Sequence, residues 1–97
     1  MTREEIISEL QKDKNLLVQK MGVQNIALFG SYAKNSQQDD SDIDFLIELK
    51  ELSYTHLHNA YVFLSKKFPG KKIQIIRKGP HLSPKFLRSI QKDLIYV

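Results

Sequence analysis

Two aspartates, Asp42 and Asp44, alternate with apolar residues in the segment DIDFLIEL, which otherwise has the composition of a buried strand. Side chains two residues apart on a strand project to the same face. Both carboxylates therefore point one way, while Ile43, Phe45 and Ile47 point the other way and can enter a core. Neighbouring carboxylates repel each other unless a cation lies between them, and Mg²⁺ prefers oxygen ligands of this kind together with substrate phosphates. The pair therefore predicts a metal-binding site.

A glycine and a serine, Gly30 and Ser31, follow the apolar run NIALF. Glycine after a strand lets the backbone approach a ligand closely, and the N–H groups of a following helical turn attract phosphate. The Ser31 hydroxyl can add a hydrogen bond to a phosphate oxygen. The chain between Gly30 and Asp42 is long enough for a turn, a loop and a return in a neighbouring antiparallel strand. This spacing predicts a phosphate-binding turn beside the metal carboxylates, as a nucleoside triphosphate requires.

Each of these motifs also has a purely structural explanation. A lone Gly-Ser after a strand is commonly only a turn, and a lone Asp-x-Asp commonly marks the entry to a strand. Their occurrence together, in this order and between two predicted strands, favours the nucleotide site.

The composition is that of a single globular domain of 97 residues, with 41% hydrophobic and 27% charged residues. The absence of cysteine excludes disulfides and thiolate metal sites. The apolar runs are too short for a membrane span, and the acidic start MTREEIISEL lacks the pattern of a signal peptide, so we expect a cytoplasmic protein. The net charge of +4 favours anionic partners such as nucleotides or nucleic acid.

Capping residues and periodicity predict the elements that position the two motifs. Thr2 and Glu5 fit a capping box and Gly22 a helix stop, so a helix is expected over 3–21. Strands are expected over 25–29, 42–49 and 71–78, with one helical turn near 31–34. The order predicts an α+β domain with a small mixed sheet of about three strands and helices covering one face.

Two further helices are predicted in the second half of the chain. Ser53 can cap a helix that ends at Pro69-Gly70, and Ser83-Pro84 is a typical start for the last helix. The first of these helices carries an apolar stripe, which is more often core than a ligand site and is otherwise a partner interface. The stripe consists of Tyr54, Leu57, Tyr61, Leu64 and Phe68.

The segment FGSYAKNSQQDDSDIDFLIEL resembles the signature of the minimal nucleotidyltransferase family, within the DNA polymerase beta superfamily. Lys34 stands where arginine is commoner in that signature, and Asn35 replaces a usual glycine, which asparagine can do because it tolerates left-handed backbone. The similarity covers nearly the whole chain, including the closing FLRSIQKDLIYV. The residues that match the signature are Gly30, Ser31, Ala33, Lys34, Ser41, Asp42 and Asp44.

The resemblance implies a minimal nucleotidyltransferase fold and a Mg²⁺-dependent transfer of a nucleotidyl group, AMP from ATP, to an acceptor hydroxyl. Asp42 and Asp44 would be the catalytic residues and would hold two metal ions. Gly30 and Ser31 would hold the triphosphate, and Tyr32 and Lys34 could flank it unless they lie in a solvated loop. Members of the family are often antitoxins paired with a helical HEPN-domain ribonuclease, so the resemblance also implies such a partner. The protein could form a hetero-oligomer with that partner or a homo-oligomer.

The third carboxylate of the superfamily lies on a later strand, and Gln74 occupies the corresponding place in KKIQIIRKG. A neutral amide cannot act as a general base and is a poorer Mg²⁺ ligand than a carboxylate. Glu48 cannot replace it, because it lies roughly 13 Å beyond Asp44 along the strand at about 3.3 Å per residue. Two interpretations follow: an active nucleotidyltransferase, or a catalytically weakened module that binds nucleotide or partner. Gln74 is also explained as a polar residue on an open sheet face.

A basic cluster brackets the same predicted strand and consists of Lys71, Lys72, Arg77 and Lys78. It could attract triphosphate or RNA, but a solvated strand edge is the favoured explanation. A third hypothesis, a small RNA-binding domain, rests on net charge alone and leaves both motifs unexplained. The three histidines, His56, His58 and His81, show no metal-like spacing with other ligands.

Overall fold

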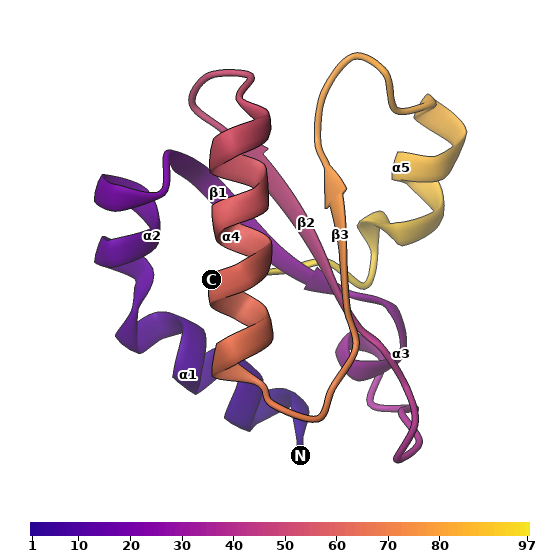
Figure 1. Ribbon diagram of the computed structural model, residues 1–97. Helices are drawn as coiled ribbons and strands as arrows, with labels where there is room; N and C mark the ends of the chain where they lie inside the picture. The colour runs from indigo at the N-terminus through magenta and orange to yellow at the C-terminus, as the bar shows by residue number, and fades with distance from the viewer.

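A computed structural model describes residues 1–97, which form five helices and four strands (Figure 1). The expected elements are present, with one additional strand at the C-terminal end and with the first helix divided in two. In chain order the elements are α1 (Arg3–Lys12), α2 (Lys14–Lys20), β1 (Val23–Phe29), α3 (Gly30–Ala33), β2 (Ile43–Leu49), α4 (Tyr54–Lys67), β3 (Ile73–Arg77), α5 (Pro84–Gln91) and β4 (Ile95–Tyr96).

The four strands form one mixed sheet in the order β3-β2-β1-β4. Strand β1 pairs antiparallel with both β2 and β4, whereas β2 pairs parallel with β3. A parallel pair needs a crossover connection, and α4 provides it between β2 and β3. The predicted α+β class with a small mixed sheet is confirmed, and the sheet has one strand more than expected.

One face of the sheet packs against α1, α2 and α4, with α4 crossing in front of the strands in Figure 1. Ile43, Phe45 and Ile47, which alternate with the two aspartates, lie on this face, as the strand periodicity predicts. All three are fully buried. Together with the helices they form the main core, which includes Ile6, Leu10, Leu17, Ile26, Leu28, Ile43, Phe45, Ile47, Leu64 and Phe68.

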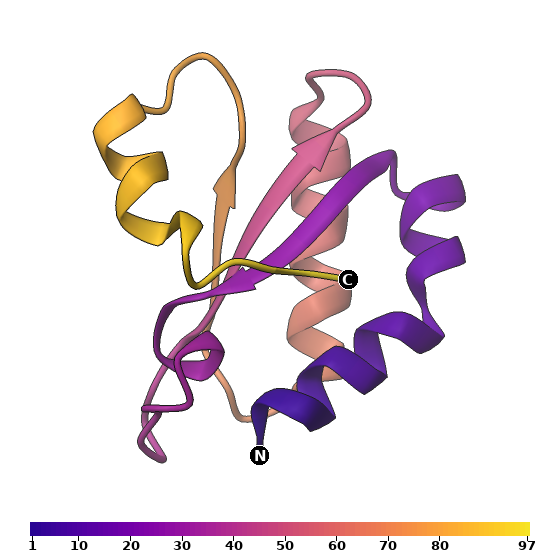
Figure 2. The ribbon, with the colours of Figure 1, turned by 180° about the vertical axis from the view of Figure 1, so that it is seen from behind.

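Helix α5 packs against the opposite face, so the helices do not all cover one face as expected (Figure 2). The reason lies in β1 and β2, where Ala27, Phe29 and Leu46 make the second face apolar as well. Phe86 of α5 meets Phe29 edge to face, with ring centroids 6.3 Å apart and planes at 89°. A sheet that is apolar on both faces requires cover on both.

The first predicted helix is interrupted at Asp13, which ends α1 and precedes α2. The Asp13 carboxylate accepts a hydrogen bond from Lys67 of α4, and Glu9 pairs with the same ammonium group at 3.2 Å. Both short helices nevertheless contribute to the main core, α1 through Ile6 and Leu10 and α2 through Leu17. None of the helices combines the length and the apolar character that crossing a lipid bilayer demands.

The apolar stripe predicted on α4 is buried only in part. Leu64 and the following Phe68 are fully buried, but the side chain of Tyr54 is 81% exposed and that of Tyr61 is 45% exposed. Both tyrosines therefore lie on the surface, beside the edge strand β3.

Candidate active site

The Gly-Ser turn and the aspartate pair lie next to each other at one end of the β1–β2 hairpin. Strand β1 ends at Phe29, whose direct partner on β2 is Asp44. Helix α3 begins at the next residue, Gly30. The return of the chain that the spacing predicted therefore occurs, and it places the start of α3 beside the first residues of β2.

Gly30 is required at its position for two reasons. Its backbone has φ +76°, in the left-handed region that favours glycine. A Cβ atom built on Gly30 would also overlap the carboxylate of Asp44. The Asp44 side chain consequently lies directly against the backbone at which α3 begins.

Asp44 is a half-buried carboxylate without a protein partner for one of its oxygens. Its Oδ1 atom is buried and makes no hydrogen bond. Burial and, to a smaller extent, the neighbouring charge of Asp42 raise the pKa of Asp44 above its ordinary value. A buried, unsatisfied carboxylate oxygen is costly, and a cation between the two aspartates would remove both the missing contact and the repulsion. The aspartate pair therefore fits a divalent metal ion.

The third acid that would complete such a site is absent from the sheet. Strands β2 and β3 pair so that Gln74 lies directly across from Asp44, and residues paired in this way share a face. Gln74 is exposed there. No group of three or more His, Asp or Glu side chains in the protein could hold a metal ion. Glu48 is occupied elsewhere, since its Oε1 accepts a hydrogen bond of 2.9 Å from the Asn25 side chain.

The residues that follow Gly30 divide between the site and the core. Ser31 is half-buried at the start of α3. Tyr32 does not flank the site, because its side chain is buried in the main core. Asn35 is the only residue besides glycines with a positive φ, which explains why asparagine can stand where the family signature has glycine.

Lys34 is exposed at the end of α3, where its Nζ lies 3.9 Å from Oδ2 of Asp93. Asp93 lies just before β4, on the other side of β1 from Asp42 and Asp44. Sequence reasoning did not single out Asp93, because the only signal is an acid in the closing segment DLIYV. Its position depends on β4, which is too short to be predicted by periodicity.

Ser41 closes the loop that leads into β2. Its hydroxyl accepts a hydrogen bond of 2.8 Å from the Gln38 N–H, and its own N–H donates to the Gln38 carbonyl at 3.1 Å. Lys71 ties the same loop to the start of β3 by donating to the Asp39 carbonyl at 2.9 Å. These contacts fix the chain immediately before Asp42.

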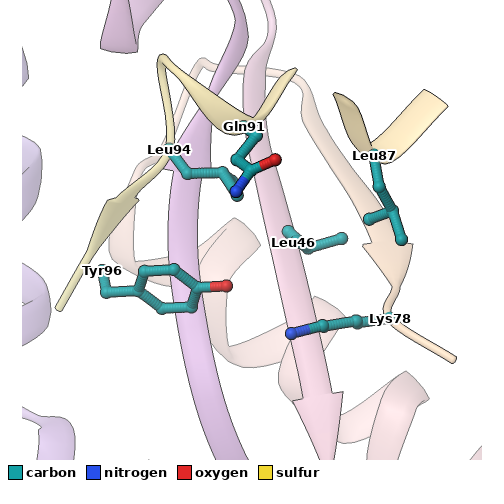
Figure 3. A pocket seen from close by; sticks show the side chains of 6 residues that line it. All are labelled: Leu46, Lys78, Leu87, Gln91, Leu94 and Tyr96. Carbon is teal, nitrogen blue, oxygen red and sulfur yellow. The ribbon is translucent and has the colours of Figure 1, made fainter. Parts of the chain in front are cut away.

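A separate pocket of about 220 Å³ lies between α5 and the sheet, on the face that also carries Asp44 (Figure 3). None of the predicted site residues lines it. The side chains of six residues line it: Leu46, Lys78, Leu87, Gln91, Leu94 and Tyr96.

The sequence matches the family model described as polymerase beta nucleotidyltransferase over residues 5–97. A protein of Methanocaldococcus jannaschii named "putative protein adenylyltransferase" is 41% identical over 97 residues, which cover 99% of this chain and 98% of that protein. The protein adenylyltransferase MntA of Thermococcus cleftensis is 27% identical over 97 residues, covering 100% of this chain and 97% of MntA.

Solved structures agree with this match at the level of the fold. One described as a "putative minimal nucleotidyltransferase" has a TM-score of 0.80 at 21% identity and covers 98% of this chain and 95% of its own. The toxin–antitoxin pair MntA–HpeT contains a chain with a TM-score of 0.64 at 16% identity, covering 99% of this chain and 72% of its own. The protein belongs to the polymerase beta nucleotidyltransferase family and has the minimal nucleotidyltransferase fold.

Proposed function

We propose that this nucleotidyltransferase transfers AMP from Mg²⁺-bound ATP to a hydroxyl group of a partner protein. The observation that carries the proposal is the half-buried Asp44 carboxylate, which lies against the backbone of Gly30, has one buried oxygen unpaired and is close enough to Asp42 for that charge to raise its pKa. Metal ligands and a phosphate-binding turn are the two parts that nucleotidyl transfer needs in one place. The names of the relatives, protein adenylyltransferases, support the choice of AMP and of a protein acceptor.

Each side chain has a specific role in this proposal. Asp42 and Asp44 would hold the metal ions, which would supply positive charge against the phosphates when bound. The backbone at Gly30 and the Ser31 hydroxyl bind the triphosphate at the start of α3. Lys34 lies at the other end of that short helix, where its ammonium group can contact the outer phosphates.

We propose a helical HEPN-domain protein as the partner, with this chain as the antitoxin. The toxin–antitoxin pair MntA–HpeT, one chain of which shares the fold, supports a toxin–antitoxin role, and the HEPN domain of the partner rests on the family resemblance.

The position of Gln74 supports a second candidate function, a module that binds nucleotide or partner but transfers slowly. Gln74 lies across from Asp44 and cannot take a proton from the acceptor hydroxyl. Loss of a carboxylate from such a metal site can cost several kcal/mol of transition-state stabilisation, which is about a thousandfold in rate.

One experiment separates the two functions. The protein is incubated with Mg²⁺, ATP labelled at the α-phosphate and the helical protein encoded beside it. We expect label on the partner, and we expect Asp42→Asn or Asp44→Asn to reduce transfer at least about a thousandfold. Glu48→Gln is the matched control, because it removes an acid from the same strand without touching the site.

The alternative outcomes are equally informative. Transfer by Gln74→Asp alone would identify the natural chain as a binding module. Absence of ATP binding in calorimetry, in both the natural chain and the variant, would contradict both functions.

A further inference from the structure

Strand β3 forms an open edge of the sheet, because it pairs with β2 on one side only. The Ile43 N–H donates to the Lys72 carbonyl at 2.9 Å, and the Lys78 N–H donates to the Ile47 carbonyl at 2.7 Å. In a parallel ladder the backbone groups of alternate residues turn toward the partner strand. These two hydrogen bonds fix which residues do so, and the remaining backbone N–H and C=O groups face outward. They belong to Ile73, Ile75 and Arg77.

An aromatic groove of about 440 Å³ runs between this edge and α4. Tyr54 and Tyr61 line it, and both are exposed, at 81% and 45%. Tyrosine is enriched at protein interfaces, since it offers a large apolar area at low entropic cost. The other residues that line the groove are Leu57, His58, Ile73, Gln74 and Ile75.

Four cations bracket the edge, and none of them pairs with a carboxylate. Lys71 and Lys72 precede β3, and Arg77 and Lys78 lie at its end. Lys71 donates to a backbone carbonyl and Arg77 contacts the imidazole of His81. Antiparallel pairing of two copies of β3 would bring these like charges together, which is unfavourable. An acidic segment would instead find a cation near each of its ends.

We propose that the β3 edge and the α4 groove together bind an extended, acidic segment of a partner protein as an added strand. The outward backbone groups of Ile73 and Ile75 would hydrogen-bond to the segment. Tyr54 and Tyr61 would contact its alternate side chains, and the four cations would select acidic residues at its ends.

A segment bound in this way would lie beside the candidate active site. Gln74 is the neighbour of Asp44, and the added strand would lie about 4.7–4.9 Å beyond β3 and roughly twice that distance from β2. Its side chains on the Gln74 face would therefore project to the same side of the sheet as the aspartate pair, with β3 between them. The binding itself is independent of catalysis, but its use in presenting an acceptor hydroxyl rests on the proposed function.

The binding is tested with the full chain and a synthetic fluorescent peptide, without Mg²⁺ or ATP. The peptide alternates valine and threonine between two pairs of glutamates, and a control peptide carries lysines in place of the glutamates. We expect the acidic peptide to bind at least about tenfold more tightly. We also expect it to slow amide hydrogen exchange at Ile73, Ile75 and Arg77.

Variants identify the surface that binds the peptide. Tyr61→Ala is expected to weaken binding about tenfold, and Lys72→Glu to weaken it with a reduced dependence on salt. Tyr96→Ala is the matched control, because Tyr96 is a 52% exposed tyrosine on the opposite edge strand β4. Circular dichroism establishes that each variant is folded.

Several results would overturn the proposal. These are equal affinity for the two peptides, an effect of Tyr96→Ala as large as that of Tyr61→Ala, and unchanged exchange at the three amides. Protection of the same amides by self-association without peptide would assign the edge to a second copy. Binding of an oligoribonucleotide instead of the peptide would assign it to RNA. These peptide-binding measurements involve no nucleotide transfer. A negative result in them would therefore overturn the proposed binding surface without affecting the proposed function, and a negative transfer assay would do the opposite.

Discussion

The carboxylate of Asp44 occupies the space that a side chain at Gly30 would need. This contact brings together the Gly-Ser motif and the Asp-x-Asp motif. From the sequence alone, each motif could be explained separately, as a turn or as the entry to a strand. Gly30 permits the left-handed turn into α3 and also lets the aspartate approach the backbone. The glycine therefore serves the geometry of the site as well as that of the turn.

Gly30→Ala should damage both stability and transfer. The left-handed backbone costs a residue with a side chain about 1–2 kcal/mol. The new methyl group must also displace the Asp44 carboxylate, so we expect transfer to fall at least about a hundredfold. Thermal melting and the label-transfer assay measure the two effects.

Gly70→Ala provides the control for this change. Gly70 has φ +80°, but nothing lies within 4 Å of a Cβ built on it. The Gly70→Ala variant should lose a similar amount of stability to Gly30→Ala and should retain the nucleotidyl-transfer activity. Equal loss of transfer in both variants would show that the contact with Asp44 is unimportant.

Asp44→Asn should raise thermal stability at neutral pH in the presence of EDTA. Burial, and then the charge of Asp42, raise the folded-state pKa of Asp44 above its ordinary value of 3.8. The folded state thus holds this proton more tightly than the unfolded state. The associated stability is present below pH 3.8 and is lost as the pH rises through the raised pKa. A higher melting temperature for Asp44→Asn is therefore expected at pH 7 and a much smaller difference at pH 3. A lower melting temperature at pH 7 would contradict this account.

Gln74→Asp should increase transfer and make folding more dependent on metal. The new carboxylate would lie across from Asp44 and supply the missing acid, so we expect a rise of at least about tenfold in rate. Without metal, the added negative charge should lower the melting temperature, and Mg²⁺ should restore it. Gln24→Asp, at an exposed position on β1, is the control and should change neither quantity.

Lys34→Gln should raise the KM for ATP about tenfold and leave kcat nearly unchanged. The reason is that the ammonium group is expected to bind phosphate equally well in the ground state and in the transition state. Lys34→Arg should restore the affinity, since it retains the charge. Asp93→Asn removes the only carboxylate near Lys34 and should change KM by a smaller factor. Steady-state kinetics that show a loss in kcat alone would indicate a different role.

Much of the arrangement of the candidate site was predictable because it depends on local patterns. Strand alternation correctly placed Ile43, Phe45 and Ile47 in the core and Asp44 on the opposite face. The spacing from Gly30 to Asp42 correctly predicted an antiparallel return. These inferences use only the period of a strand and the length of a loop.

The remaining features depend on contacts between distant segments. The short strand β4 and the packing of α5 on the second face follow from the apolar surface around Phe29, which the sequence does not assign to a partner. Burial of Tyr32 and the approach of Asp93 to Lys34 depend on how α3 and the C-terminal segment meet the sheet. Periodicity carries no information on such contacts.

The β1–α3–β2 hairpin contains every residue from Gly30 to Asp44, whereas Gln74 joins it only through the α4 crossover. Contacts that are close in sequence form earlier during folding than those that require a long loop to close. We therefore expect pulsed hydrogen exchange during refolding to protect the amides of β1 and β2 before those of β3. The segment proposed to bind the triphosphate would then be an early, nearly independent unit of folding. Changes at position 74 would affect the rate of transfer without disturbing how that unit forms.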